Sequence, residues 1–461
     1  MCINSFKQNY FPRDFMTTDN IIFNKKVISD MQLQKIINRL IEIYFERQYT
    51  KFIPGQSKVP LQIPTYGAEE VIEVLDSLFT TFVTMGKKVE MFEKEFANYL
   101  GARHAVMVNS GSSANLIAMS ILTNEAFPNR ILSGQEIIVP ATLWTTTINP
   151  IGDVSAIPVV VDVELDTMNI DPEKIEAAIT DKTRAIMPVH LLGNPAKIKE
   201  IMEIAEKHNL FVIEDTCESH GAWVDGKKVG TFGDIGTFSF FFSHHISTIE
   251  GGMVVTNDDE IAELARSLRV FGWARSSKRY EEYALQYPNI DKRFLFVNKG
   301  FNFRPTDLQG AIGIHQMKKL EKYIEIRRQN AAYWTKRFKE FSDHLIVHEE
   351  RPGTRHVWFG QPLTVRHAAP FTRDELTKHL EENKIETRPV QISNIAQQPS
   401  AKFVKHRVHG ELKNAQYIMD HSFFFGNHQG IGKEEREYVA DVIADFVEKK
   451  TKNKLGRQIS F

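Results

Sequence analysis

Cysteine is scarce in this sequence: only Cys2 and Cys217 occur among 461 residues. Two cysteines exclude a disulfide framework, and they exclude a zinc site or an iron–sulfur cluster with four cysteine ligands. The fold must therefore be held by its own core. A chain of this length with 42% hydrophobic residues is ample for one.

A long apolar run and an excess of one charge are also missing. No stretch of about 18 apolar residues is present to span a bilayer, and the first twenty residues lack the apolar core of a signal peptide. Lysine plus arginine number 57 and aspartate plus glutamate 58, which gives a net charge of −1. This balance argues against a nucleic-acid partner or a membrane surface, which both call for concentrated positive charge. We expect a soluble, cytoplasmic protein.

Short apolar segments alternate with helical patterns between about residues 59 and 305. The segments are nearly continuous Val, Ile and Phe, as in strands buried on both faces. They are 105–108, 137–139, 157–161, 185–189, 210–213, 236–241 and 253–256. The alternation predicts an α/β fold with a mostly parallel sheet covered by helices. Ligands of such sheets bind beyond the carboxyl ends of the strands, so the polar residues there are the candidates for a site.

Three parts are expected along the chain. Residues 1–58 form an N-terminal extension with an amphipathic helix, which carries Leu33, Ile36, Ile37, Leu40 and Tyr44 at three-and-four spacing. Residues 59–318 form the large domain. Residues 319–461 form a smaller α+β domain, entered by a long helix over about 306–341 and closed by a helix over 433–449.

The segment 109–115, Asn-Ser-Gly-Ser-Ser-Ala-Asn, joins a predicted strand to a predicted helix. Free backbone N–H groups and the helix dipole at such a junction bind phosphate, and Gly111 lets a ligand approach the backbone closely. The same pattern is compatible with a serine N-cap that binds no ligand.

Asp215 follows the predicted strand 210–213. A carboxylate at such a buried place needs a cationic partner, or its pKa rises, and a protonated ring nitrogen is one such partner. The alternative is an aspartate that caps the following helix.

A third segment, 238–252, runs from an apolar strand into His244 and His245 and ends in Glu250-Gly251-Gly252. Adjacent histidines point in different directions, and no second cluster has metal-ligand spacing. We therefore expect no metal site.

Two shorter segments complete the set of candidates. Trp144 lies just beyond a predicted strand end, where an aromatic face is placed to stack on a planar ligand; it is also compatible with a core position. Gly300-Phe301-Asn302-Phe303-Arg304 precedes the long helix.

Taken in this order, the segments resemble the sugar aminotransferase family of pyridoxal phosphate (PLP) enzymes of fold type I. The resemblance covers about residues 60–455, and it depends on the ordered set of motifs more than on any one of them. It implies an aspartate aminotransferase-like fold with a large domain and a smaller C-terminal domain.

The resemblance also implies roles for the matching residues. Gly111 and Ser112 would give backbone N–H groups to the cofactor phosphate, and Ser239 its hydroxyl. Asp215 would pair with the pyridine nitrogen, Trp144 would stack on the ring, and Glu218 would lie near the phenolic oxygen, where the family often has glutamine. Asn302 would reach a phosphate in the neighbouring subunit, which implies a homodimer.

His244 departs from the family pattern, which has lysine at this position. Imidazole has no primary amine, so it cannot form the Schiff base that this lysine forms. The cofactor would then be held non-covalently, with pyridoxamine phosphate (PMP) as its working form. Imidazole titrates near neutrality and can move protons, so His244 is the predicted catalytic base.

In having histidine at this position, the sequence resembles one subgroup of the family, the 3-dehydratases. These enzymes make 3-deoxysugars for lipopolysaccharide O-antigens. Ser243–Gly252 and Gly426–Gln429 look most like its colitose-pathway branch. The ascarylose-pathway branch, similar at Ile53–Ser57, carries a [2Fe–2S] cluster on four cysteines, and this chain has two. The resemblance thus implies C3 dehydration of a nucleotide-linked 4-keto-6-deoxyhexose, with L-glutamate restoring PMP.

Three arginines are candidates for carboxylate or diphosphate contacts, because guanidinium binds both with two hydrogen bonds: Arg275, Arg304 and Arg388. Each is equally compatible with a surface ion pair. Two other functions stay open at this point. One is an ordinary sugar aminotransferase that tolerates His244, and the other is an inactive family member retained for binding or assembly.

Overall fold

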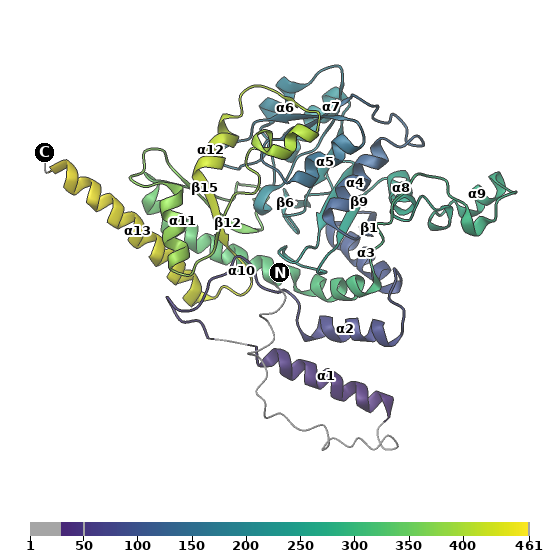
Figure 1. Ribbon diagram of the computed structural model, residues 1–461, viewed down its shortest axis with the longest axis horizontal. Coiled ribbons are helices and arrows are strands. Elements are labelled where there is room, and N and C mark those ends of the chain that lie inside the picture. The colour runs from purple at the N-terminus through teal and green to yellow at the C-terminus, as the bar shows by residue number, and fades with distance from the viewer. Residues whose placement is uncertain (1–28, 49–50, 460–461) are drawn as a thin grey trace. The chain divides into compact units, whose positions relative to one another are not determined.

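A computed structural model describes residues 29–48 and 51–459 (Figure 1). The chain divides into two compact units, residues 1–49 and 50–461. In the described part of the first unit, helix α1 spans Asp30–Glu46, and Ser29 and Gln32 cap its start reciprocally. This helix confirms the amphipathic helix expected from Leu33 to Tyr44.

An eight-stranded sheet forms the centre of the second unit (Figure 1). Its order is β1-β9-β8-β5-β4-β2-β3-β14. The strands are β1 His104–Val108, β2 Glu136–Pro140, β3 Ile157–Val161, β4 Thr183–Ile186, β5 Phe211–Asp215, β8 Ile235–Ser239, β9 Gly252–Thr256 and β14 Arg407–Val408. Only β9 runs antiparallel to its neighbours in this sheet. The predicted α/β fold with a mostly parallel sheet is confirmed.

Helices cover both faces of this sheet, and this explains the continuous apolar strands. Ile137 and Val139 of β2 pack into the core on one face, whereas Ile138 packs into the core on the other. The first face is covered by α4 Gly111–Leu122, α5 Thr145–Asp153 and α8 Asp259–Arg269. The second is covered by α3 Lys87–Leu100, α6 Pro172–Ala178 and α7 Ile198–His208.

Helix α10, Asp307–Phe338, runs from this sheet into the C-terminal part and confirms the predicted long helix. Thr306 and Gln309 form a capping box at its start. The Asp307 carboxylate accepts backbone N–H groups of Gly86, Lys88 and Val89 at 3.1 Å each, which ties α10 to the start of α3. Helix α2, Ala68–Phe79, packs beside α10.

The C-terminal part is built on an antiparallel sheet of order β10-β12-β15-β13. Its strands are β10 Leu345–Val347, β12 Gly360–Val365, β13 Thr387–Pro389 and β15 Ser422–Gly426, with helices α11 Arg373–Glu382, α12 Lys413–His421 and α13 Lys433–Ile459. A third, small sheet joins β11 Thr354–Arg355, β6 Trp223–Val224 and β7 Lys227–Lys228. Helix α9, Tyr280–Gln286, lies in a projecting arm (Figure 1). The boundaries predicted at residues 58 and 318 stay predictions.

Strand β14 was not predicted, and it connects the C-terminal part to the large sheet. It pairs in parallel with β3. Arg407 makes two hydrogen bonds to the Glu136 carboxylate of β2, at 3.0 and 2.9 Å. Just beyond it, Asp162 accepts the backbone N–H groups of Asn414 and Ala415 at the start of α12. Strand pairing, side-chain hydrogen bonds and a helix cap therefore join the C-terminal part to the large sheet.

Within residues 29–48 and 51–459, no helix combines the length and the apolar character that crossing a membrane requires.

Candidate active site

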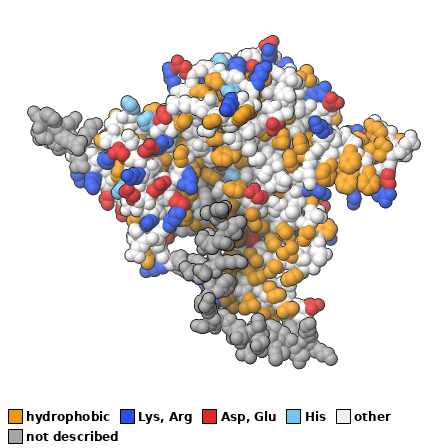
Figure 2. All heavy atoms as spheres, in the orientation of Figure 1, with side chains coloured by type: hydrophobic (Ala, Val, Ile, Leu, Met, Phe, Trp, Pro, Cys, Tyr) orange, Lys and Arg blue, Asp and Glu red, His pale blue; other side chains and the backbone are white. Residues whose placement is uncertain are grey.

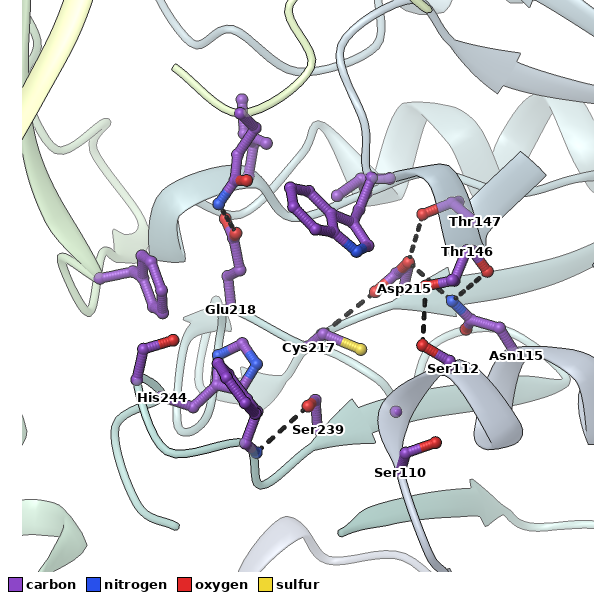
Figure 3. A pocket seen from close by; sticks show the side chains of 18 of the residues that line it. Ser110, Ser112, Asn115, Thr146, Thr147, Asp215, Cys217, Glu218, Ser239 and His244 are labelled. Atoms are coloured by element: carbon purple, nitrogen blue, oxygen red, sulfur yellow. Dashed lines mark hydrogen bonds between the residues drawn. The ribbon is translucent and has the colours of Figure 1, made fainter. Parts of the chain in front are cut away.

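A pocket of about 380 Å³ opens at the carboxyl ends of the parallel strands, where ligands of such sheets bind (Figure 3). Segments that follow β1, β2, β4, β5 and β8 line it, and the C-terminal part adds Phe359 and Gln391. Seven of the predicted site residues are among its lining: Gly111, Ser112, Trp144, Asp215, Glu218, Ser239 and His244.

One wall of the pocket is the N-terminus of α4. Ser110 is the N-cap, and its hydroxyl accepts the backbone N–H of Ser113 at 3.1 Å. Gly111 lies against Ser239 at the end of β8: a Cβ on Gly111 would be 2.5 Å from Ser239 Cβ and 2.9 Å from its Oγ. The hydroxyl of Ser239 and the first free N–H groups of α4 thus face the same space, a geometry that fits a phosphate.

Replacing Gly111 with alanine should therefore impair both packing and phosphate binding. The added methyl overlaps Ser239, and such overpacking costs about 1–3 kcal/mol of stability. We expect a lower thermal midpoint and PLP affinity reduced by about tenfold or more, measured by fluorescence titration of the apoprotein. Ser112→Ala is the matched control because it keeps the backbone N–H. An equal loss of PLP affinity in Ser112→Ala would contradict the backbone role.

Asp215 is the last residue of β5 and its carboxylate is buried (Figure 3). Oδ2 accepts the Thr147 hydroxyl at 2.8 Å and the Asn115 amide at 3.1 Å, and Oδ1 accepts the backbone N–H of Cys217 at 3.2 Å. No lysine, arginine or histidine of the described residues forms an ion pair with it. A buried carboxylate fixed by three donors and facing a pocket fits a protonated pyridine nitrogen.

Glu218 is turned toward the same pocket and is held by two donors. The Leu192 backbone N–H donates to Oε2 at 2.7 Å, and the Gln391 amide donates to Oε1. Burial raises the pKa of Glu218 to about 8, and the charge of Asp215 acts in the same direction. At neutral pH the side chain is thus a carboxylic acid that can donate a hydrogen bond, as a glutamine amide does.

Because Glu218 is protonated, we can predict the direction in which Glu218→Gln changes the pH dependence of stability. Between about pH 4.5 and 8 the folded protein holds a proton on Glu218 that the unfolded chain has lost. Wild-type stability should fall by about 1.4 kcal/mol per pH unit from this group alone, and the loss should level off above pH 8. Glu218→Gln lacks this dependence, so its urea midpoint relative to wild type should rise with pH. Parallel pH profiles of the two proteins would show that Glu218 is ionised in the folded state.

His244 lies in an apolar corner of the pocket (Figure 3). Its ring is 5.4 Å from that of Phe359 and 6.3 Å from that of Phe241 between centroids. Its Nδ1 is buried, with no hydrogen-bond partner among the described residues. Burial, and next the charge of Arg327, lower the pKa of His244 to about 3. The imidazole is therefore neutral at physiological pH, and the negative charge of a bound phosphate would raise its pKa toward the range of a useful base.

Arg327 on α10 is a residue that the sequence analysis missed. Its guanidinium is fully buried and donates to the backbone carbonyls of Trp358, Phe359 and Asn427. Burial lowers the pKa of Arg327 to about 9. It occupies the apolar side of α10, seven residues after Leu320 and four before Ala331. A charged residue in that apolar stripe was the available sequence signal. Through Phe359 it holds the wall against which His244 packs.

The four remaining predicted residues lie elsewhere. Arg275, Asn302 and Arg304 line a separate hollow of about 850 Å³, where Arg304 Nε donates to Asn302 Oδ1 at 3.0 Å. Arg388 lies exposed on β13. The structure does not bring any of the four into the pocket of their own chain, so their contacts with a ligand stay predictions.

Other residues of the pocket were not assigned from the sequence. Asn115 lies one turn after Gly111 on α4, so its inward position was accessible from helical spacing. Thr147, Phe359 and Gln391 carried no comparable signal. In the part of the chain that the structure describes, no group of three or more His, Cys, Asp or Glu side chains is arranged to hold a metal ion.

Comparisons with known proteins agree with this geometry. Residues 64–444 match the profile of the DegT/DnrJ/EryC1/StrS aminotransferase family. The chain is 41% identical over 374 residues to GDP-4-keto-6-deoxy-D-mannose 3-dehydratase of Yersinia pseudotuberculosis, which is 80% of this chain and 94% of that protein.

Two solved structures are similar to most of this chain. One is E. coli GDP-4-keto-6-deoxy-D-mannose-3-dehydratase with bound hydrated PLP, with a TM-score of 0.77 and 36% identity over 84% of this chain and 99% of that one. The other is GDP-4-keto-6-deoxymannose-3-dehydratase with a trapped PLP-glutamate geminal diamine, with a TM-score of 0.77 and 36% identity over 83% and 99% of the two chains.

Proposed function

The chain belongs to the DegT/DnrJ/EryC1/StrS aminotransferase family, and we propose that it is a nucleotide-sugar 3-dehydratase of that family. Its cofactor is PLP, which alternates with PMP. The observation that carries the proposal is His244, which lines the pocket. The resemblance matches it to the lysine with which other family members anchor the cofactor. An imidazole can move a proton there but cannot hold the cofactor covalently.

Several pocket residues would hold the cofactor. The start of α4 and the hydroxyl of Ser239 fit its phosphate, Asp215 fits the ring nitrogen, and protonated Glu218 fits the phenolic oxygen. Trp144 is 55% exposed at the N-terminus of α5, with its ring free to cover a planar ligand. When bound, PMP supplies the amine that joins the C4 ketone of the sugar and a ring that delocalises the electron pair expelling the C3 hydroxyl.

His244 is the proton carrier in this proposal. Its neutral imidazole accepts one proton at the reacting centre, and the buried ring of Phe359 shields that side of the imidazole from bulk water. The imidazolium then returns the proton to the hydroxyl that leaves C3, so that water departs. Asp215 keeps its orientation toward the ring nitrogen, because Thr147, Asn115 and Cys217 donate hydrogen bonds to its carboxylate.

The proposed substrate is GDP-4-keto-6-deoxy-D-mannose, the sugar nucleotide in the names of the similar enzymes. L-Glutamate is the proposed amino donor, supported by the PLP–glutamate complex of the similar enzyme. The product would be a 4-keto-3,6-dideoxyhexose, released with ammonia and 2-oxoglutarate. The reaction would belong to deoxysugar synthesis for lipopolysaccharide and would take place in the cytoplasm.

A homodimer is a further part of the proposal. Asn302 and Arg304 lie outside the pocket of their own chain, and a second copy would bring them to it. Hydrophobic side chains gather on part of the surface in Figure 2. Exposed apolar residues available for such an interface include Leu78, Phe79, Phe82 and Ile249. Light scattering is expected to give the mass of two chains, and Phe79→Asp to shift it toward one. A wild-type protein that is monomeric and fully active would contradict the dimer.

Mass spectrometry of the reaction tests the function. Purified protein, PMP and L-glutamate are incubated with 4-keto-6-deoxyhexoses linked to GDP, CDP, dTDP or UDP, without a reductase. Loss of the C3 oxygen from the GDP sugar, with ammonia and 2-oxoglutarate formed, is expected. A 4-amino sugar that keeps its C3 oxygen would mean an aminotransferase. No turnover of any of the four, with PMP bound, would favour an inactive family member.

A further inference from the structure

A cluster of three histidine rings begins at the pocket and continues into the core. The ring of His220 is 6.0 Å from that of His244 and 5.7 Å from that of His245 between centroids. His220 itself is fully buried and does not line the pocket. Its other ring neighbours are three phenylalanines: Phe96, Phe238 and Phe240. A fourth apolar ring would fill this space without burying polar atoms, so the imidazole of His220 calls for a polar role.

Four nitrogens of the cluster are buried and have no hydrogen-bond partner among the described residues. They are both ring nitrogens of His220, Nδ1 of His244 and Nδ1 of His245. Buried polar atoms of folded proteins are almost always paired. A water between two nitrogens closes a gap that is too wide for a direct hydrogen bond, because it accepts from one nitrogen and donates to the other. Two such links, from His244 to His220 and from His220 to His245, pair all four nitrogens.

The far end of the cluster sets the direction of these links. Nε2 of His245 lies 2.9 Å from the Val357 carbonyl, which can only accept, so this nitrogen carries the proton. Burial lowers the pKa of all three rings, so each is neutral and has one donor and one acceptor. Nδ1 of His245 is therefore an acceptor, which takes the one ring proton of His220. The other nitrogen of His220 then accepts, and Nδ1 of His244 donates to it.

The Ser239 carbonyl leads to the same direction. It lies close enough to His220 to act on the pKa of that ring against the effect of burial. A carbonyl oxygen, like Nδ1 of His245, can only accept, so either group takes the proton of His220 and leaves its other nitrogen an acceptor. The positive charge of Arg327 also lowers the pKa of all three rings, which favours their neutral forms.

We propose that His220 is a positioning residue for His244. By accepting a hydrogen bond from Nδ1, it keeps the proton of neutral His244 on that buried nitrogen. Nε2 is left to face the pocket with its lone pair free, as a base requires. In the opposite tautomer Nε2 carries the proton, and His244 cannot accept another. The inference rests on the proposed function of His244 as proton carrier, and it adds the residue that prepares His244 for that function.

Nitrogen NMR tests the tautomer without any turnover. The full-length protein is labelled with ¹⁵N-histidine, loaded with PMP and measured without substrate, above the pH at which His244 titrates. Protonated and unprotonated ring nitrogens have well-separated shifts, and the signals of His244 are those that disappear in His244→Asn. Wild type is expected to show a protonated Nδ1 and an unprotonated Nε2 in His244, and His220→Phe the reverse. A protonated Nε2 in wild type, or an unchanged tautomer in His220→Phe, overturns the proposal.

Kinetics separate positioning from packing. His220→Phe suits the surrounding phenylalanines but has no ring nitrogen. Its kcat for C3 oxygen loss should fall about 10–100-fold, the value of one hydrogen bond to a group that becomes charged, with KM for the sugar and PMP affinity nearly unchanged. His220→Gln keeps a donor and an acceptor and should restore kcat to within a few-fold of wild type. In a His244→Asn background, His220→Phe should cause no further loss, because it acts through His244.

Two kinetic results contradict the proposal. Equal losses in His220→Phe and His220→Gln, or a further loss in the His244→Asn background, would mean that His220 serves packing alone. Thermal midpoints and PMP affinities show that each variant is folded and loaded. Asparagine at position 245 also keeps a donor and an acceptor, so His245→Asn leaves the cluster connected. If wild type dehydrates none of the sugar nucleotides, the proposed function fails, whereas the NMR result still decides the tautomer of His244.

Discussion

Replacing His244 with asparagine is expected to lower the dehydration rate by about 10²–10⁴-fold, the usual contribution of a positioned acid–base group. Asparagine keeps a polar side chain of similar reach but cannot carry a proton at neutral pH. Its small size also suits the corner formed by Phe359 and Phe241. The rate of C3 oxygen loss should be measured at saturating PMP by mass spectrometry, together with PMP affinity, which should change little because His244 is not the anchor.

His245 supplies the matched control. It is the next residue in the chain, but its ring is buried and its Nε2 lies 2.9 Å from the Val357 carbonyl, away from the reacting groups. His245→Asn should lower thermal stability and leave a rate within about tenfold of wild type. If His244→Asn turned over as fast as wild type, His244 would not be the base. If His245→Asn were the slower of the two at equal folded fraction, the roles would be exchanged.

Replacing Asp215 with asparagine should give the second large loss. The substitution keeps the shape and most hydrogen bonds of the side chain but removes the charge that fits the protonated ring nitrogen. A hydrogen bond to a charged group is worth about 1.5–3 kcal/mol, so PLP affinity should fall about 10–150-fold. Turnover at saturating cofactor should fall by a further factor of about 10² or more, because the charge also stabilises the electron-accepting form of the ring.

The Thr147→Val variant distinguishes the effect of the Asp215 charge from the effect of the hydrogen bonds that hold the carboxylate. It removes one donor to Asp215, the Thr147 hydroxyl at 2.8 Å, and leaves the carboxylate in place. PLP affinity in this variant should fall less than tenfold, as expected for one hydrogen bond. A loss as large as that of Asp215→Asn would mean that the position of the carboxylate, and not its charge, controls binding.

The large sheet was predictable because its strands are buried on both faces and therefore carry a continuous apolar signal. The ends of the strands were predicted less accurately. The predicted segment 185–189 ends as a strand at Ile186, and Asp215, expected just beyond its strand, is the last residue of β5. Strand β14 has two residues and no apolar pattern of its own, and its pairing with β3 is a tertiary effect. Nothing in the local sequence indicates it.

The pocket was predictable to the extent that its residues follow strand ends. Gly111, Asp215 and His244 each stand after a recognisable strand, so their convergence follows from a parallel sheet. Phe359 and Gln391 enter from the C-terminal part, more than a hundred residues later, and only the folded chain brings them there. The protonation of Glu218 was equally out of reach, because it results from burial in the folded chain, which outweighs the opposing hydrogen bonds from Leu192 and Gln391.

Strand β14 bears on how the enzyme admits its substrate. An enzyme with two independent domains can open by rotating one against the other. Here a rotation of the C-terminal part would have to break the pairing of β14 with β3, both bonds from Arg407 to Glu136, and the cap that Asp162 forms on α12. Crossing the same boundary nearer the pocket, Ile395 also donates its backbone N–H to the Ala141 carbonyl at 3.0 Å. These contacts oppose domain closure. We therefore expect Phe359 and Gln391 to stay at the pocket, and loading and release to use side chains and short loops at its rim.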